Sequence, residues 1–306
     1  GQSGSTNRAS RKSQAMVALP VLLSGVVAMQ EAVVGRLAPT PSGLLHLGNV
    51  LAFGAAWLAV RQEGGRLLLR VEDLDRGRAR AAVATAQRED LVWLGIGWDA
   101  EVPPQSVRTY AADGLPVYRC DCTRRQRLAG ACTCAQHSAV AGRTCFRCPR
   151  VLRTFADELQ GPQQFAPTTD PTVFSADGTA AYPLAVVVDD HRDGVTQVVR
   201  GADLLSATVE QICIAEALGI PRPRYLHVPV LIGRDGRKLS KSHGSTEVRS
   251  LHASGWTPDD IWALLLPLLG LPPVHLHAVG AADWAARCAP AGPLMVEPDG
   301  PPGRPC

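Results

Sequence analysis

The chain has 306 residues, of which 46% are hydrophobic and 19% charged, so it can bury a core and is not a disordered chain. Its formal net charge of +3 is too low for a general polyanion-binding protein. No apolar run approaches the length of a helix that spans a bilayer.

The first 32 residues lack the pattern of a folded element. Arg8, Arg11 and Lys12 precede an apolar stretch over 16–29 that resembles a weak signal peptide. This stretch contains Pro20, and no good cleavage site follows it. We therefore expect 1–32 to be a disordered tail, or coding sequence upstream of the true start.

The next segment has the alternation of a parallel α/β fold. An apolar β-branched strand is predicted at 33–37 and a second strand at 66–71, with helices at 48–61 and 79–94. This order is a βαβ unit, which predicts a Rossmann-type parallel sheet. Residues 33–118 would form the first half of this α/β domain, with 99–118 as a proline-rich loop.

The second half is expected over 154–250, after a Cys- and Arg-rich insertion at 119–153. Apolar runs at 182–189 and 195–200 flank His191-Arg192-Asp193-Gly194, which predicts a hairpin. A helix is predicted at 206–218 and a strand at 225–232. Residues 251–306 would form a short helical segment, with a helix over 256–269 interrupted at Pro267, and a mobile tail.

The loop after the first strand predicts a phosphate site. It runs from Pro39 to Asn49, and its prolines and glycines fix a turn that backbone amides can present to a ligand. The following helix begins at Gly48, where N-terminal amides favour an anion, and His46 can donate to a phosphoryl oxygen. The alternative is a histidine packed at a strand–helix turn.

A second phosphate-binding segment is predicted at Lys238-Leu-Ser-Lys-Ser242. The chain has only three lysines, and two of them are Lys238 and Lys241. Two ammonium groups on flexible stems can follow phosphates that move during a reaction. A solvated surface loop is the alternative.

Together these motifs resemble a known family. Arg36-Leu-Ala-Pro-Thr-Pro-Ser-Gly-Leu-Leu-His-Leu-Gly48 and the Lys-Leu-Ser-Lys-Ser segment are similar to the class I aminoacyl-tRNA synthetases. Residues 70–75 (Arg-Val-Glu-Asp-Leu-Asp), 182–190 and 199–205 narrow the resemblance to the glutamyl branch. It covers about residues 34–245. Because only about 60 residues follow, the chain resembles the truncated glutamyl-queuosine tRNA(Asp) synthetases, which lack an anticodon-binding domain.

This resemblance implies an enzyme that activates glutamate with ATP and Mg²⁺. It then attaches the glutamate to the queuosine base in the anticodon loop of tRNA(Asp). A cytoplasmic monomer with no membrane partner is expected. The implied catalytic residues are His46 and Lys241. The implied glutamate site comprises Arg36, Leu37, Ala38, Pro39, Thr40, Glu72, Tyr182 and Arg200. The implied ATP site comprises His46, Gly48, Asn49, Lys238, Ser240 and Lys241.

The side-chain chemistry agrees with these roles. The ammonium of an amino acid needs a carboxylate such as Glu72, and its carboxylates need guanidinium groups such as Arg36 and Arg200. Taken singly, Arg200 or Glu72 would more often form a surface ion pair. Tyr182 alone would more often lie at the edge of the core.

Six of the nine cysteines fall between 120 and 148. A disulfide framework fits poorly, since the chain is long and the number is odd. The family's zinc site uses Cys-x-Cys and then Tyr-x-x-x-Cys, which Cys120, Cys122 and Cys145 match, while Ala141 replaces the tyrosine. We choose Cys148 as the fourth ligand. The alternatives are Cys132, Cys134 or His137, or a site that has been lost.

The insertion also concentrates positive charge. Residues 119–153 contain eight arginines and one acid, Asp121, so they carry +7 while the rest of the chain carries −4. An Arg-rich insertion can contact a tRNA backbone, although solvated arginines are the simpler explanation.

Three features depart from the family pattern: Ala141, Pro183 beside Tyr182, and a shortened segment between Ser106 and Cys120. These departures are consistent with a weakened enzyme. Three rival interpretations also remain. These are the catalytic core of an ordinary glutamyl-tRNA synthetase, another nucleotidyltransferase, and a non-catalytic tRNA- or zinc-binding descendant.

Overall fold

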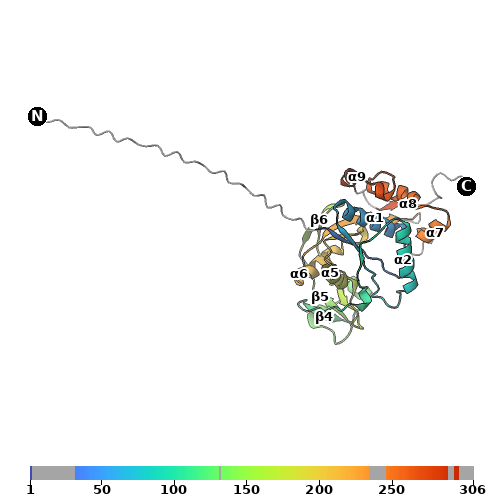
Figure 1. Cartoon of the computed structure of the whole chain (residues 1–306). Coiled ribbons are helices and arrows are strands. Elements are labelled where there is room, and N and C mark those ends of the chain that lie inside the picture. The colour runs from blue at the N-terminus through green and yellow to red at the C-terminus, as the bar shows by residue number, and fades with distance from the viewer. Residues whose placement is uncertain (2–31, 131, 234–245, 289–292, 296–306) are drawn as a thin grey trace. The chain divides into compact units, whose positions relative to one another are not determined.

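The structure is a computed structural model that describes residues 1, 32–130, 132–233, 246–288 and 293–295 (Figure 1). The predicted N-terminal extension and the Lys-Leu-Ser-Lys-Ser segment lie outside these residues. The longer helices are α1 (Leu47–Gln62), α2 (Ala81–Trp93), α5 (Tyr182–Arg192), α6 (Thr208–Ala217) and α8 (Pro258–Leu265). The short helices are α3 (Arg124–Leu128), α4 (Cys134–His137), α7 (Val248–Ala253) and α9 (Ala281–Ala285), with 3₁₀ turns η1 (Gln105–Val107), η2 (Ala202–Leu204), η4 (Leu266–Leu269) and η5 (Leu276–Ala278).

Two of the sheets, which contain most of the parallel strands, adjoin each other. One sheet has the parallel order β1 (Val34–Leu37), β2 (Arg66–Leu69), β3 (Ala100–Glu101). The other has the order β7 (Gly161–Phe165), β6 (Arg153–Asp157), β10 (Arg224–Val228), β9 (Gln197–Gly201), with β7 alone antiparallel. They adjoin where Thr196 N donates to Val34 O at 2.8 Å, just before β9 begins. The predicted α/β class with a parallel sheet is thereby confirmed.

The insertion folds around a separate antiparallel sheet. Its order is β4 (Val117–Cys120), β5 (Arg143–Phe146), β8 (Thr172–Phe174). In Figure 1, β4 and β5 lie at the end of the molecule opposite the C-terminal helices α7–α9. A further pair joins β11 (Leu231–Ile232) to β12 (Leu294–Met295).

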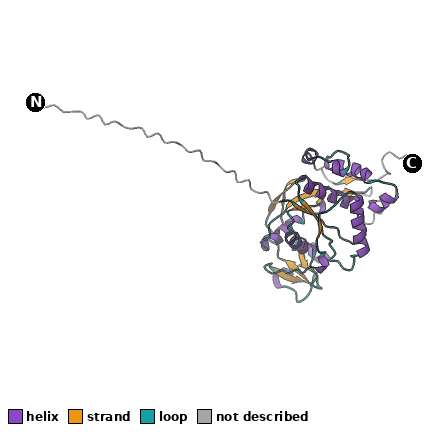
Figure 2. Cartoon of the chain, in the orientation of Figure 1, coloured by secondary structure: helices purple, strands orange, loops and turns teal. Residues whose placement is uncertain are grey.

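Helix α1 is the centre of the largest core cluster. Residues on several sides of this helix are buried, which suits a helix packed between other elements (Figure 2). At Gly54 a Cβ would lie 2.6 Å from the ring of Trp262, so only glycine allows α8 to approach this closely. Trp262 is 1% exposed, and its Nε1 donates to Leu94 O at 2.9 Å. Helix α8 is therefore packed into the same hydrophobic core as α1.

The hairpin predicted at 182–200 is wrong in its first arm. Residues Tyr182–Arg192 form helix α5, with a proline in the first turn, where the missing N–H costs nothing. The run Val186–Val188 suggested a strand, but Asp189 and Asp190 lie on the buried face of a helix and pair with arginines. Gly194, at φ 71°, follows the end of the helix.

The other predicted elements agree with the structure to within a few residues. The predicted interruption at Pro267 is the change from α8 to the 3₁₀ turn η4. Across the described part of the chain, no helix combines the length and the apolar character needed to cross a membrane.

Candidate active site

A cavity of about 400 Å³ opens where β1 and β9 end and α1 begins. This is the edge at which open parallel sheets bind ligands. The structure brings most of the predicted glutamate and ATP residues to its walls: Arg36, Ala38, Pro39, Thr40, His46, Gly48, Asn49, Glu72, Tyr182 and Arg200. Leu37 is the exception, because side chains alternate along a strand and its own is fully buried in the core.

His46 is the N-cap of α1. Its Nδ1 accepts from Gly48 N at 3.1 Å, while Asn49 Oδ1 accepts from His46 N at 3.2 Å. Since Nδ1 accepts, a neutral ring carries its proton on Nε2. The predicted role as a donor and the alternative role as a structural histidine are therefore compatible, because they use different ring nitrogens.

Arg36 and Glu72 belong to a buried network of charges. Asp190 accepts from Arg36 Nε at 3.2 Å and from Arg70 Nη2 at 2.6 Å. Arg70, which is fully buried, also donates to Glu72 Oε1 at 3.2 Å and to Asp193 Oδ2 at 3.0 Å. The network joins the ends of β1 and β2 to α5, so each cavity-facing charge is held from behind.

The two buried acids of this network differ in protonation behaviour. Burial raises the pKa of Glu72 above its usual value, against the lowering effect of Arg70 and Arg36. Burial would also raise the pKa of Asp190, but Arg36 and Arg70 outweigh it and hold that pKa low. Asp190 is thus well compensated, whereas Glu72 would be stabilised as a carboxylate by a further cation.

Arg200 and Tyr182 face each other across the cavity wall. Arg200 Nη1 donates to the Tyr182 hydroxyl at 3.3 Å, which connects β9 to the first residue of α5. Arg200 is 6% exposed and Tyr182 is 36% exposed. The pair therefore presents a cation and a hydroxyl at the mouth of the cavity.

Lys238, Ser240 and Lys241 lie outside the described residues, but the chain on either side reaches the cavity. Leu231 is one of its lining residues. Glu247 forms a β-bridge with His46, and Val248 N donates to Leu45 O at 2.9 Å.

Gln87, on α2, supports the loop over 39–49 and was not predicted. Its Nε2 donates to Thr40 O at 3.0 Å and to Gly43 O at 2.7 Å. Only its place on the buried face of a predicted helix, where a polar residue is unusual, could have indicated this contact.

Four cysteines of the insertion form a compact cluster. The Sγ atoms of Cys120, Cys122, Cys132 and Cys134 all lie within 4.8 Å of one another. The Sγ atoms of Cys120 and Cys132 are 3.6 Å apart, and so are those of Cys122 and Cys134. Tetrahedral zinc with Zn–S bonds of about 2.3 Å would place its sulfurs about 3.8 Å apart. The donor set and its spacing therefore fit a structural zinc ion.

Comparison with known proteins identifies the family. A family model for "tRNA synthetases class I (E and Q), catalytic domain" matches residues 32–127 and 131–282. A glutamyl-Q tRNA(Asp) synthetase of Nitratidesulfovibrio vulgaris is 41% identical over 312 aligned positions, covering 87% of this chain and 96% of its own. The corresponding protein of Nocardia farcinica is 39% identical, with 87% and 94% covered.

The chain belongs to the glutamyl-Q tRNA(Asp) synthetase family. It is thus a ligase-type enzyme of the class I synthetase family. Among solved structures, a glutamate tRNA ligase from Elizabethkingia meningosepticum superimposes with a TM-score of 0.67 over 87% of this chain and 67% of its own. At 21% identity, that likeness supports the fold alone.

Within this glutamyl-Q tRNA(Asp) synthetase family member, the structure replaces part of the predicted zinc ligand set. Cys145 and Cys148, expected to bind zinc with Cys120 and Cys122, lie outside the cluster, and Cys132 and Cys134 complete it. Cys145 lies opposite Tyr118 on the sheet, and its Sγ is 3.6 Å from Arg127 Nη1. Cys148 is buried in a different cluster, with Cys213 of α6.

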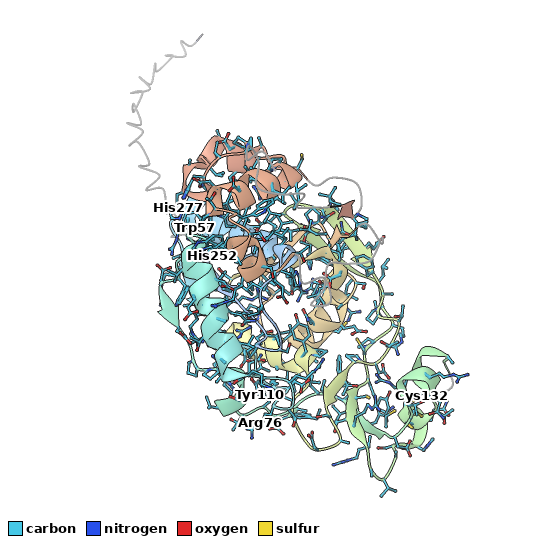
Figure 3. All side chains as sticks on the ribbon, turned by 90° about the vertical axis from the view of Figure 1, so that its right-hand side faces the viewer. Trp57, Arg76, Tyr110, Cys132, His252 and His277 are labelled. Carbon is cyan, nitrogen blue, oxygen red and sulfur yellow. The ribbon has the colours of Figure 1, made fainter. Side chains whose placement is uncertain are left out.

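The positive charge of the insertion is partly neutralised within the fold. Arg150 pairs with Asp170 at 2.8 Å and Arg153 pairs with Glu216 at 3.0 Å. Figure 3 shows Cys132 on the insertion, well apart from Trp57 and His277 at the other end of the molecule. The insertion is therefore a separate surface, distant from the C-terminal helices.

Proposed function

We propose that this protein activates glutamate with ATP, forming glutamyl-adenylate, and transfers the glutamyl group to the queuosine base of tRNA(Asp). One observation carries the proposal. A single cavity joins a buried carboxylate, two buried guanidinium groups and the N-terminus of α1.

The polar groups of the cavity match free glutamate. Glu72 accepts a hydrogen bond from Arg70, but burial still raises its pKa. The ammonium of glutamate would supply a further cation that stabilises the Glu72 carboxylate. The two carboxylates of glutamate would pair with Arg36 and Arg200, and the Tyr182 hydroxyl offers a further hydrogen bond. This arrangement favours a dicarboxylic amino acid over an amide or an apolar one.

The helix end of the cavity suits the nucleotide. In the first step, the α-carboxylate of glutamate attacks the α-phosphorus of ATP, and pyrophosphate leaves. The N–H on Nε2 of His46 would stabilise the developing phosphoryl charge, together with the ammonium of Lys241 and the positive end of the α1 dipole. Mg²⁺ would accompany the triphosphate through its phosphate oxygens.

The second substrate needs its own access. A hollow of about 470 Å³ adjoins the first cavity and shares Thr40, Glu72 and Tyr182 with it. Arg76, labelled in Figure 3, lies on its wall. The queuosine base would enter here, so that a hydroxyl of its cyclopentene ring attacks the activated carbonyl of glutamate, loses its proton and displaces AMP.

Zinc would be held by Cys120, Cys122, Cys132 and Cys134. When bound, it supplies no chemistry to the cavity and cross-links the end of β4 to α4. The Arg-rich surface around this site would then be firm enough to contact a tRNA backbone.

The decisive experiment is ATP–pyrophosphate exchange with purified protein in the absence of tRNA. Glutamate should support exchange, whereas aspartate and glutamine should not. Glutamylation of queuosine-containing tRNA(Asp), but not of the same transcript without queuosine, tests the second step. Exchange that requires tRNA(Glu) would instead indicate an ordinary glutamyl-tRNA synthetase. Folded protein without exchange under any condition would indicate a non-catalytic binding protein.

A further inference from the structure

Arg200 is held from behind by a buried chain of hydrogen bonds. Its Nε donates to His227 Nε2 at 3.1 Å, and His227 Nδ1 lies 2.6 Å from Asp157 Oδ2. The side chains of His227 and Asp157 are both fully buried. The three residues lie on the neighbouring strands β9, β10 and β6, so the chain of contacts runs across the sheet.

These contacts fix the tautomer of His227. An arginine Nε is always a donor, so His227 Nε2 must accept, and its ring proton must be on Nδ1. Asp157 receives that proton as a carboxylate. Burial lowers the pKa of His227 despite the opposing effect of Asp157, and nearby Arg200 lowers it further. The ring is thus neutral and in the one tautomer that can hold Arg200.

Asp157 is itself fixed by the backbone. Its Oδ1 accepts from Leu159 N at 3.0 Å, from Gln160 N at 2.8 Å and from His227 N at 3.2 Å. Its two oxygens therefore have separate tasks: one orders the β6–β7 turn and the other orients the imidazole.

The contacts leave one edge of Arg200 for a ligand. Nε and Nη2 donate to His227 and to Thr208 Oγ1, the latter at 2.7 Å, while Nη1 donates to Tyr182. A guanidinium has five N–H groups, so one hydrogen on each of Nη1 and Nη2 remains after these contacts. Both of these nitrogens can therefore still donate a charge-assisted hydrogen bond to a carboxylate.

We propose that His227 and Asp157 are positioning residues for the amino-acid substrate, because they orient Arg200 to receive one of its carboxylates. Neither residue lines the cavity, so they would act through Arg200 and through its partner Thr208, whose Oγ1 lies 3.1 Å from His227 Nε2. The inference rests on the proposed function, since it assigns an amino acid to this cavity.

Two substitutions of His227 separate this role from simple packing. In His227→Gln, the amide oxygen can occupy the position of Nε2 and still accept from Arg200, but the contact with Asp157 is lost. In His227→Asn, the amide can reach Asp157 but not Arg200. Both variants remove the ring and reduce the buried area of the side chain, so they serve as controls for each other.

Asp157→Asn tests the tautomer. With its oxygen held by the three backbone amides, the new amide group would donate to His227 Nδ1 and force the proton onto Nε2. An N–H would then point at the Nε–H of Arg200. Gln160→Ala is the local control, because it removes a side-chain amide that donates to the backbone oxygen of His227 at 2.8 Å and keeps the backbone N–H that Asp157 accepts.

The measurement is ATP–pyrophosphate exchange with KM determined separately for glutamate and for ATP. We expect His227→Asn and Asp157→Asn to raise KM for glutamate about tenfold or more, the effect of losing a hydrogen bond to a charged group. KM for ATP should stay constant. His227→Gln should lie much closer to wild type, and Gln160→Ala should match it.

The outcomes separate this inference from the proposed function. Equal KM values for glutamate in His227→Asn and His227→Gln, or parallel losses for glutamate and ATP, would overturn the positioning role alone. Wild-type protein that exchanges with no amino acid would overturn the proposed function and the substrate role together. Nitrogen NMR of the His227 ring reads the tautomer without any substrate, and a proton on Nε2 would also refute the inference.

Discussion

The cavity and the cysteine cluster hold their polar groups by different means. The cavity collects residues far apart in the sequence, such as Arg36 and Arg200, and fixes them through buried charges and hydrogen bonds. The cluster uses four cysteines within residues 120–134, packed mainly against Tyr118, Cys145 and one another. The first should stay ordered without any ligand, whereas the second has little apolar core of its own and should depend on a metal.

The strongest test of the cavity is removal of Asp190, the buried carboxylate that Arg36 and Arg70 share. Asp190→Ala should reduce the free energy of unfolding by about 3–5 kcal/mol, because Arg36 and Arg70 would remain buried without their shared partner. Urea unfolding measures this. Glu89→Ala, which removes an exposed partner of Arg249, should cost no more than about 1 kcal/mol. Similar losses in the two variants would contradict the importance of the buried network.

The matching test of the insertion is removal of one thiol. Cys132→Ser should lose most of its bound zinc, as measured by metal analysis of the purified protein, because a tetrahedral site then lacks a ligand. Cys145→Ser should retain the metal. Exchange with glutamate should change little in either variant, since the cysteines lie outside the cavity. Loss of zinc from Cys145→Ser but not from Cys132→Ser would instead support Cys145 and Cys148, the ligands inferred from the sequence.

Arg200→Lys sharpens the contrast by keeping the charge and removing the geometry. A lysine cannot bind His227, Thr208 and a carboxylate at once. We expect kcat/KM for glutamate in the exchange reaction to fall about 10- to 100-fold, corresponding to the loss of charge-assisted hydrogen bonds. Arg153→Lys, at a pair with Glu216 outside the cavity, is the control. If both variants kept wild-type kcat/KM, Arg200 would not be a substrate ligand.

The smallest effect is a dependence of stability on pH. Burial keeps the pKa of His227 below its usual 6.5, and Arg200 lowers it further while Asp157 and Asp203 oppose this. As the pH falls below 6.5, the unfolded chain binds a proton that the folded protein resists, so stability decreases. The slope from this one group is at most about 1.4 kcal/mol per pH unit.

Comparing wild type with His227→Gln isolates this contribution. The advantage of wild type in free energy of unfolding should shrink between pH 8 and pH 5.5. Tyr225, whose ring stacks on His227, stays uncharged throughout this range because burial raises its pKa to about 12. An advantage that grows on acidification would mean that His227 is protonated in the folded protein.

The fold was predictable where local signals agree. Prolines and glycines mark the boundaries of the first βαβ unit and of the loop around His46, and the structure confirms those elements. Helix α5 was not predictable from its valines, because what determines it is tertiary. Asp189 and Asp190 find arginines only when the sheet is assembled.

The site divides in the same way. Residues within motifs, such as Arg36 and Glu72, could be placed at the cavity in advance. Asp157 and His227 could not, because no spacing in the sequence relates strands that become neighbours only in the sheet. The cysteines show the intermediate case. Their chemistry indicated a metal, but only the fold shows that Cys145 pairs with Tyr118 on the sheet while Cys132 and Cys134 reach Cys120 and Cys122.

The contact between Gly54 and Trp262 has an evolutionary consequence. The indole of α8 occupies the space where a side chain on α1 would begin, and α1 carries His46 at its first turn. Positions 54 and 262 are therefore not independent. Across related sequences, a residue larger than glycine should appear at 54 only where the residue at 262 is smaller than tryptophan. Substitutions in the C-terminal segment are therefore limited by the helix that positions His46.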